Sequence, residues 1–139
     1  MHWIVDGNNV MGAGADGWWN DPVAAAARLT QVIAEWSRTH HDQVSVVFDG
    51  APHDRIAELA GGNMAVLFAT RRGRDAADDR IVELVETLLD QEAAPPGEIT
   101  VVTSDRLLRR RLPGQVESIG AGRFRTRIGL GSGRGRRPG

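Results

Sequence analysis

Residues 2–9, His-Trp-Ile-Val-Asp-Gly-Asn-Asn, decide the fold, because an apolar run here ends in an aspartate and a turn. Asp105 closes a second run, residues 99–104, and Asp78 stands at the start of a helical pattern that follows a third run, residues 64–69. The carboxyl ends of the strands in an open parallel sheet share one edge, so we expect these three acids to converge although they are far apart in sequence. Converging carboxylates form a site for a hard cation.

Strand and helix patterns alternate along the rest of the chain. The helix pattern at 21–38 is the clearest, because apolar residues recur at helical spacing behind the start signal Asp21-Pro22. Strands are predicted at 2–5, 44–48, 64–69, 99–103 and 115–119, and helices at 21–38, 75–91 and 105–111, with a weaker helical pattern at 53–60. This alternation predicts an α/β fold in three layers, with a mostly parallel central sheet flanked by helices.

Composition favours a single soluble domain. The chain has 139 residues, of which 41% are hydrophobic, so it is long enough to bury a core. It has no cysteine, which excludes disulfides, thiolate metal sites and cysteine nucleophiles. No apolar stretch is long enough for a membrane span and no leader pattern precedes the first strand, so we expect a cytoplasmic protein. The folded domain is expected over 1–128, followed by a disordered Gly/Arg-rich tail over 129–139.

The net charge of −1 conceals a strong asymmetry. Residues 1–105 hold 17 of the 18 acids and seven of the 17 arginines, whereas residues 106–139 hold ten arginines and one acid, Glu117. A basic end on an acidic body favours a polyanionic partner, because arginines neutralise phosphates and release counterions. The alternative is a solvated tail in a protein whose basic residues are all arginine.

Two sets of arginines are candidates for holding a phosphate backbone beside the acids. Arg109, Arg110 and Arg111 follow Asp105 within two helical turns. Arg123, Arg125 and Arg127 alternate, as side chains on one face of an extended segment do. Such contacts would give affinity without sequence choice.

Helical geometry separates the acids at the start of the 75–91 helix. Its apolar stripe places Asp78 about 60° from the stripe's centre and Asp79 about 160° away, so Asp78 should face the sheet edge and Asp79 should face water. Asp75 is expected to cap the helix. A structural alternative also exists for Asp78, since acids in a first turn are favoured by the helix dipole.

The remaining candidates also have structural alternatives. Asn9 could orient a ligand or the attacking water, or it could be a turn residue. Asp105 could lie in the first turn of a short helix capped by Thr103 or Ser104. Residues 12–17 match the GxGxxG pattern, but they follow a turn and not a strand, so we interpret them as a loop. Trp18-Trp19 beside this loop could stack on RNA bases, although packing over a helix start is favoured.

Four motifs resemble, in order and spacing, those of NYN domains in the PIN-like nuclease superfamily, specifically the YacP-like branch. They are Val-Asp-Gly-Asn-Asn-Val at 5–10, Val-Val-Phe-Asp-Gly at 46–50, Ala-Asp-Asp-Arg-Ile at 77–81 and Val-Val-Thr-Ser-Asp at 101–105. The resemblance implies a PIN-like sheet and a metal-dependent endoribonuclease, with ribosome-associated RNA cleavage in this branch. It implies metal-binding acids at Asp6, Asp78 and Asp105, with Asn9 and Asp49 lining the same pocket.

We therefore expect a Mg²⁺- or Mn²⁺-dependent endoribonuclease that acts on single-stranded RNA, translation-linked mRNA included. Phosphodiester hydrolysis places extra negative charge on the transition state, which one or two divalent ions can stabilise. Three converging carboxylates repel one another without metal, so at least one should have a raised pKa. The alternative is a catalytically inactive RNA-binding module whose acids are caps and turns. A phosphatase-type hydrolase is disfavoured, because no Asp-x-Asp pair follows the first strand.

Overall fold

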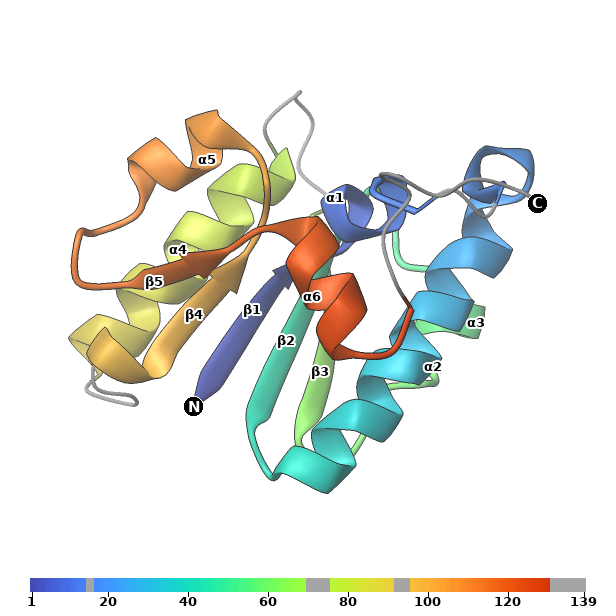
Figure 1. Ribbon diagram of the computed structural model, residues 1–139, viewed down its shortest axis with the longest axis horizontal. Coiled ribbons are helices and arrows are strands. Elements are labelled where there is room, and N and C mark those ends of the chain that lie inside the picture. Colours follow the sequence, from blue (N-terminus) through green and yellow to red (C-terminus); the bar gives the residue numbers. More distant parts are fainter. Residues whose placement is uncertain (15–16, 70–75, 92–95, 131–139) are drawn as a thin grey trace.

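The computed structural model describes residues 1–14, 17–69, 76–91 and 96–130. The described chain alternates strands and helices as the sequence predicts (Figure 1). The strands are β1 (His2–Asp6), β2 (Gln43–Asp49), β3 (Met64–Ala69), β4 (Ile99–Val102) and β5 (Glu117–Ile119). The helices are α1 (Gly7–Gly12), η1 (Trp18–Asn20), α2 (Pro22–His40), α3 (Asp54–Ala57), α4 (Ala76–Asp90), η2 (Pro96–Glu98), α5 (Arg106–Arg111) and α6 (Ala121–Arg127).

One five-stranded sheet in the order β3-β2-β1-β4-β5 forms the centre of the fold. All four strand pairings are parallel, which confirms the α/β prediction and makes the sheet more uniformly parallel than expected. β1 occupies the middle position, and Val5 pairs with both Val46 and Val102. The ends of β1, β2 and β4 therefore share one edge, where α1 begins (Figure 1).

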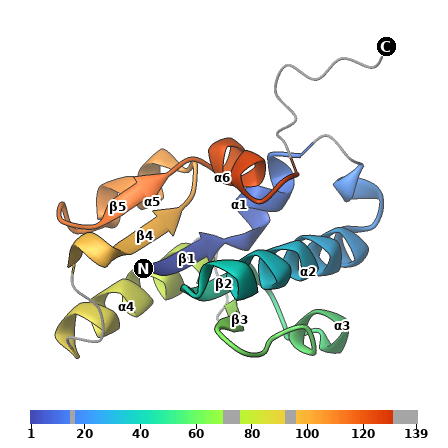
Figure 2. The ribbon, with the colours of Figure 1, turned by 60° about the horizontal axis from the view of Figure 1, so that its bottom comes forward.

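Helices cover both faces of the sheet. One core joins the sheet to α1, α2, α3 and α6, and includes Trp3, Val5 and Phe124. The other joins Ile4 and Val101 to α4 and α5. Neighbouring residues of β1 thus enter opposite cores, as the alternation of side chains along a strand requires. Figure 2 shows α6 and α4 on opposite sides of β1.

The predicted start of α2 is confirmed in detail. The side chain of Asp21 accepts a hydrogen bond from the backbone N–H of Ala24 at 3.1 Å, and Pro22 occupies the first turn. The helix ends at His41, whose φ of 58° is left-handed. None of the described helices combines the length and the hydrophobicity of a membrane span.

Two helices were missed from the sequence. The turn expected at Asp6-Gly7-Asn8-Asn9 is wrong, because α1 begins at Gly7, directly after β1. The extended segment expected around Arg123 to Arg127 is also wrong, because α6 forms there. Both helices are short, and α6 is decided by core residues at helical spacing, Phe124 and Ile128, which the alternating arginines obscure.

The predicted tail starts too early by two residues. The backbone N–H of Gly129 donates to the carbonyl of Thr126, and that of Leu130 donates to the carbonyl of Arg125 at 2.8 Å. Leu130 also packs against the core. These two residues therefore complete the end of α6. The rest of the predicted tail, residues 131–139, lies outside the described residues.

Candidate metal centre at the carboxyl edge of the sheet

Asp6 is the most buried acid at the carboxyl edge of the sheet, with 5% of its surface exposed. The hydroxyl of Thr103 donates to its Oδ2 at 2.9 Å. Burial raises the pKa of Asp6 from its ordinary 3.8 to about 6, and the carboxylates of Asp78 and Asp49 push it in the same direction. The Thr103 hydroxyl and the backbone N–H of Asn9 act against this rise. The main cause of this raised pKa is the burial of Asp6, whereas the sequence predicts repulsion among converging acids as the cause.

Asp78 and Asp49 reach this edge from a helix and from a neighbouring strand. Asp78 lies in the first turn of α4 and is half-buried, and Asp49 is the exposed last residue of β2. The carboxylates of Asp78 and Asp49 both raise the pKa of Asp6, so both lie near it. We call Asp6, Asp49 and Asp78 the acid cluster.

Asp79 is turned away from the acid cluster, as helical geometry predicts. Its Oδ1 lies 2.8 Å from the guanidinium of Arg111, and 39% of its side chain is exposed. This ion pair ties α4 to α5 at the surface. Asp75, which was predicted to cap α4, lies outside the described residues.

Asp105 lies beside the acid cluster and has a structural task. It is itself the N-cap of α5, since its Oδ1 accepts the backbone N–H groups of Leu107 and Leu108 at 2.9 and 3.4 Å. The alternative in which Thr103 or Ser104 caps this helix is therefore wrong. Asp105 is linked to Asp6 through Thr103, whose hydroxyl accepts the backbone N–H of Asp105 at 3.1 Å.

Two amides at the start of α1 hold the strand ends together. The Oδ1 of Asn9 accepts the backbone N–H of Ser104 at 2.8 Å, and the Oδ1 of Asn8 accepts the backbone N–H of Asp49 at 2.8 Å. Asn9 thus fastens the end of β4, and Asn8 fastens the end of β2. Asn8 and Thr103 were missed as site residues, although both lie in polar runs directly after apolar strands, which was the available signal.

The donor set suits a hard divalent ion by charge and atom type. A carboxylate with a raised pKa beside two others gains from a cation, and oxygen is the ligand that Mg²⁺ and Mn²⁺ prefer. Within the described ranges, however, no three acidic, histidine or cysteine side chains are spaced to hold one ion together. The predicted triad of Asp6, Asp78 and Asp105 therefore gathers at one edge without forming a closed cage.

The arginines of α5 lie at the same edge. Arg109, Arg110 and Arg111 are exposed, and the Nε of Arg109 donates to the carbonyl of Thr103 at 3.0 Å. Arg109 is thus attached to the residue that binds Asp6. Arg111 is engaged with Asp79, which leaves Arg109 and Arg110 as the members of this set best placed to meet a phosphate.

The second set of arginines does not share one face, so its predicted arrangement is wrong. Arg123 is exposed, but Arg125 is only 5% exposed, and its guanidinium donates to the carbonyl of Val10 at 3.3 Å. Arg127 lies over the ring of Trp3, 5.3 Å from its centroid. Arg125 therefore fastens α6 to α1 and is not available to RNA.

The glycine-rich segment and the tryptophan pair follow α1. Gly12 ends this helix, so the GxGxxG pattern begins at the end of a helix and not at the end of a strand, which excludes a dinucleotide-binding turn. Trp18 packs against the core, whereas Trp19 is 59% exposed. The two rings meet edge to face, 5.9 Å apart.

Comparison with known proteins identifies the family to which this fold belongs. The family model of the YacP-like NYN domain matches residues 3–124. The chain belongs to the YacP-like NYN family. Its PIN-like fold is shared by the crystal structure of Rae1 (YacP) from Bacillus subtilis in its W164L mutant form. That structure has a TM-score of 0.69 and 27% sequence identity over 91% of this chain and 74% of the other.

A second crystal structure of Bacillus subtilis Rae1 (YacP) has the same fold. Its TM-score is 0.70, with 22% identity over 92% of this NYN chain and 73% of the other. A search of curated proteins gives no match. All four sequence motifs begin and end within the matched span, so the acid cluster and Asp105 belong to the YacP-like NYN domain.

Proposed function

We propose that this NYN domain is a divalent-metal-dependent endoribonuclease that hydrolyses phosphodiester bonds in single-stranded RNA. The supporting observation is Asp6, a buried carboxylate whose pKa is raised to about 6 beside two further acids. Asp6 stands at the N-cap position of α1, but its side chain makes no capping hydrogen bond there, so the helix does not account for the burial of a carboxylate. Groups of this kind gather where chemistry needs them.

Asp6, Asp78, Asp105 and Asp49 would hold Mg²⁺ or Mn²⁺. When bound, the ion supplies Lewis-acid stabilisation of the charge that develops on the phosphate and lowers the pKa of a water. The chain's own residues prepare the site. Asp6 is deprotonated at neutral pH, since its pKa is about 6. Thr103 fixes the orientation of Asp6 by donating to Oδ2, and Asn9 holds the strand end that carries Thr103 and Asp105.

RNA is the proposed partner, with exposed Arg109, Arg110 and Arg123 meeting its backbone. Single strands suit an edge site because their phosphates can approach without a partner strand. By family resemblance the proposal extends to translation-linked mRNA as substrate, the ribosome as partner and the cytoplasm as location.

The second candidate is a catalytically inactive RNA-binding module of the same fold. It is favoured by one observation, which is that Asp105 already has a structural task as the cap of α5. In that case the acids only shape the sheet edge, and the arginines of α5 provide the affinity.

Cleavage of a labelled single-stranded RNA separates the two candidates. We expect cutting with Mg²⁺ or Mn²⁺, none with EDTA, and a loss of at least about 100-fold in Asp78→Asn. Asp79→Asn is the matched control, because it makes the same change one residue along the helix at a side chain paired with Arg111. Binding without metal-dependent cleavage, or equal rates in the two variants, would contradict the nuclease.

RNA affinity should fall steeply as salt rises. Each arginine that meets a phosphate contributes about −0.7 to the slope of log affinity against log salt for a single strand. We expect Arg110→Gln to make this slope shallower by about that amount, measured by fluorescence anisotropy across a salt series. Arg38→Gln, in the last turn of α2, is the control and should leave the slope unchanged. A flat salt response in the unaltered protein would remove the arginines from the proposal.

A further inference from the structure

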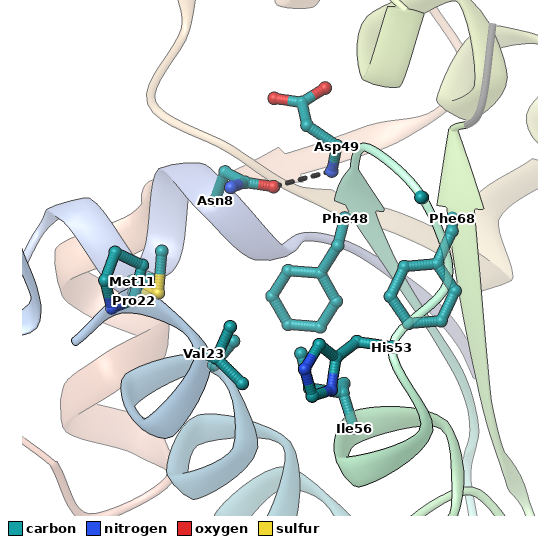
Figure 3. A pocket seen from close by; sticks show the side chains of 11 residues that line it. Asn8, Met11, Pro22, Val23, Phe48, Asp49, His53, Ile56 and Phe68 are labelled. Atoms are coloured by element: carbon teal, nitrogen blue, oxygen red, sulfur yellow. Dashed lines mark hydrogen bonds between the residues drawn. The ribbon is translucent and has the colours of Figure 1, made fainter.

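A small apolar pocket lies beside the acid cluster on the face that carries α1, α2 and α3 (Figure 3). Its volume is about 170 Å³, and its lining includes the rings of Phe48, Phe68 and His53 and the aliphatic side chains of Val23 and Ile56. Drug-sized ligands occupy pockets of about 300 Å³ or more, so this one suits a single planar ring system.

Two phenylalanine rings form one wall of this pocket. Phe48 and Phe68 come from neighbouring strands, with centroids 6.3 Å apart and ring planes 30° apart. Phe48 is held in place by Gly7, because a Cβ built on Gly7 would lie 2.6 Å from its ring. Gly7, which begins α1 directly after Asp6, therefore packs against this wall of the pocket.

The pocket adjoins the acid cluster through Asp49, which belongs to both. Asn8 and Asp49 line the pocket, and their hydrogen bond joins α1 to the end of β2. The carboxylate of Asp49 also raises the pKa of Asp6, so pocket and acid cluster meet at this residue. Figure 3 shows the carboxylate of Asp49 directed away from the phenylalanine rings. A ligand that spans both sites would thus have a planar apolar part on one side of Asp49 and an anionic part on the other.

We propose that the pocket binds one unpaired nucleobase of the RNA strand whose phosphate lies at the acid cluster. This inference rests on the proposed function for its ligand. A nucleotide has the required form, since a ribose joins its flat base to its phosphate. The base stacks on the part-exposed ring of Phe68 and lies near the Asn8 amide, and stacking of this kind tolerates any base. The pocket therefore fixes which phosphate is placed at the acids without imposing a sequence.

Abasic substitution tests this inference. The ligands are short single-stranded oligoribonucleotides that each carry one abasic ribose at a successive position, and affinity is measured with EDTA present. For the unaltered protein we expect a loss of about tenfold at one position and little at the others. Phe68→Leu keeps the apolar bulk but removes the ring, and should abolish the position-specific loss. His53→Ala, at an exposed side chain, should reduce it without affecting folding.

Trp19→Leu is the control, because it removes an exposed ring outside the pocket and should preserve the position-specific loss. The base site would be overturned by equal losses of affinity at every abasic position. It would also be overturned by a position-specific loss that persists in both Phe68→Leu and His53→Ala. The position-specific loss without any metal-dependent cleavage would overturn the nuclease and keep the base site. Metal-dependent cleavage without the position-specific loss would keep the nuclease and overturn the base site. Absence of RNA binding would overturn both proposals.

Discussion

Asp6→Asn is expected to abolish cleavage and at the same time to stabilise the metal-free protein at neutral pH. The catalytic loss follows from removing the central carboxylate of the acid cluster. The gain in stability follows because the buried carboxylate is charged at pH 7, although its pKa is about 6. Asparagine has the same shape, stays neutral, and can still accept the hydroxyl of Thr103.

The direction of the pH dependence follows from the raised pKa. The folded state retains a proton on Asp6 up to about pH 6, whereas the unfolded state loses it near 3.8. Unfolding is therefore increasingly favoured as pH rises through this interval, by up to about 3 kcal/mol in total. Asp6→Asn removes this decrease in stability between about pH 4 and about pH 6. The free energy of unfolding of the variant should therefore exceed that of the unaltered protein by about 1 to 3 kcal/mol at pH 7, and the difference should vanish below about pH 4.

Urea unfolding at pH 4 and pH 7 in EDTA measures this difference. Asp21→Asn is the control, because it makes the same chemical change at the α2 cap, where asparagine caps equally well. Its stability should match that of the unaltered protein at both values of pH. An Asp6→Asn protein that is less stable than the unaltered one at pH 7 would show that Asp6 is a structural residue.

Gly7→Ala should destabilise the protein by about 1 to 3 kcal/mol and lower cleavage at least tenfold. The new Cβ would lie 2.6, 2.7 and 3.0 Å from three atoms of the Phe48 ring, which is 3% exposed and has little room to move. Relief of this clash must shift α1 or β2, and both carry residues of the acid cluster or its supports. Chemical unfolding and the RNA cleavage assay measure the two losses.

Gly12→Ala is the matched control at the other end of α1. A Cβ there meets only a Trp18 ring atom at 4.0 Å, which is ordinary contact. Alanine is also a better helix residue than glycine, so this variant should be unchanged or more stable by up to about 1 kcal/mol. Equal changes in stability and cleavage in the two variants would mean that the close contact between Gly7 and Phe48 does not contribute to either property.

The sheet and its acid edge were predictable because long-range geometry follows from simple patterns. Once apolar runs alternate with helices, the parallel arrangement brings the ends of the runs to one edge, and the carboxylate of Asp78 raises the pKa of Asp6 there. The angle around α4 also distinguished Asp78 from Asp79, because 100° per residue is a reliable rule over one turn.

The short helices and the contacts of individual side chains were harder to predict from the sequence. A segment of six or seven residues fits helical and alternating patterns about equally, so α1 and α6 depend on core contacts such as Phe124 with Trp3. The burial of Arg125 also depends on α6 packing over Val10, which no local pattern reveals. Thr103 binds Asp6 only because residues 97 positions apart meet across the sheet edge.

The central position of β1 has a consequence for the timing of synthesis. β1 is made first, but Asp6 receives its hydroxyl donor only when residue 103 is present, and Trp3 meets the ring of Phe124 later still. A growing chain therefore contains all three acids of the cluster after residue 78, but Asp6 gains its hydrogen bond from Thr103 only after residue 103 has been translated. Under the proposed nuclease function, newly made copies become active only when folding is nearly complete.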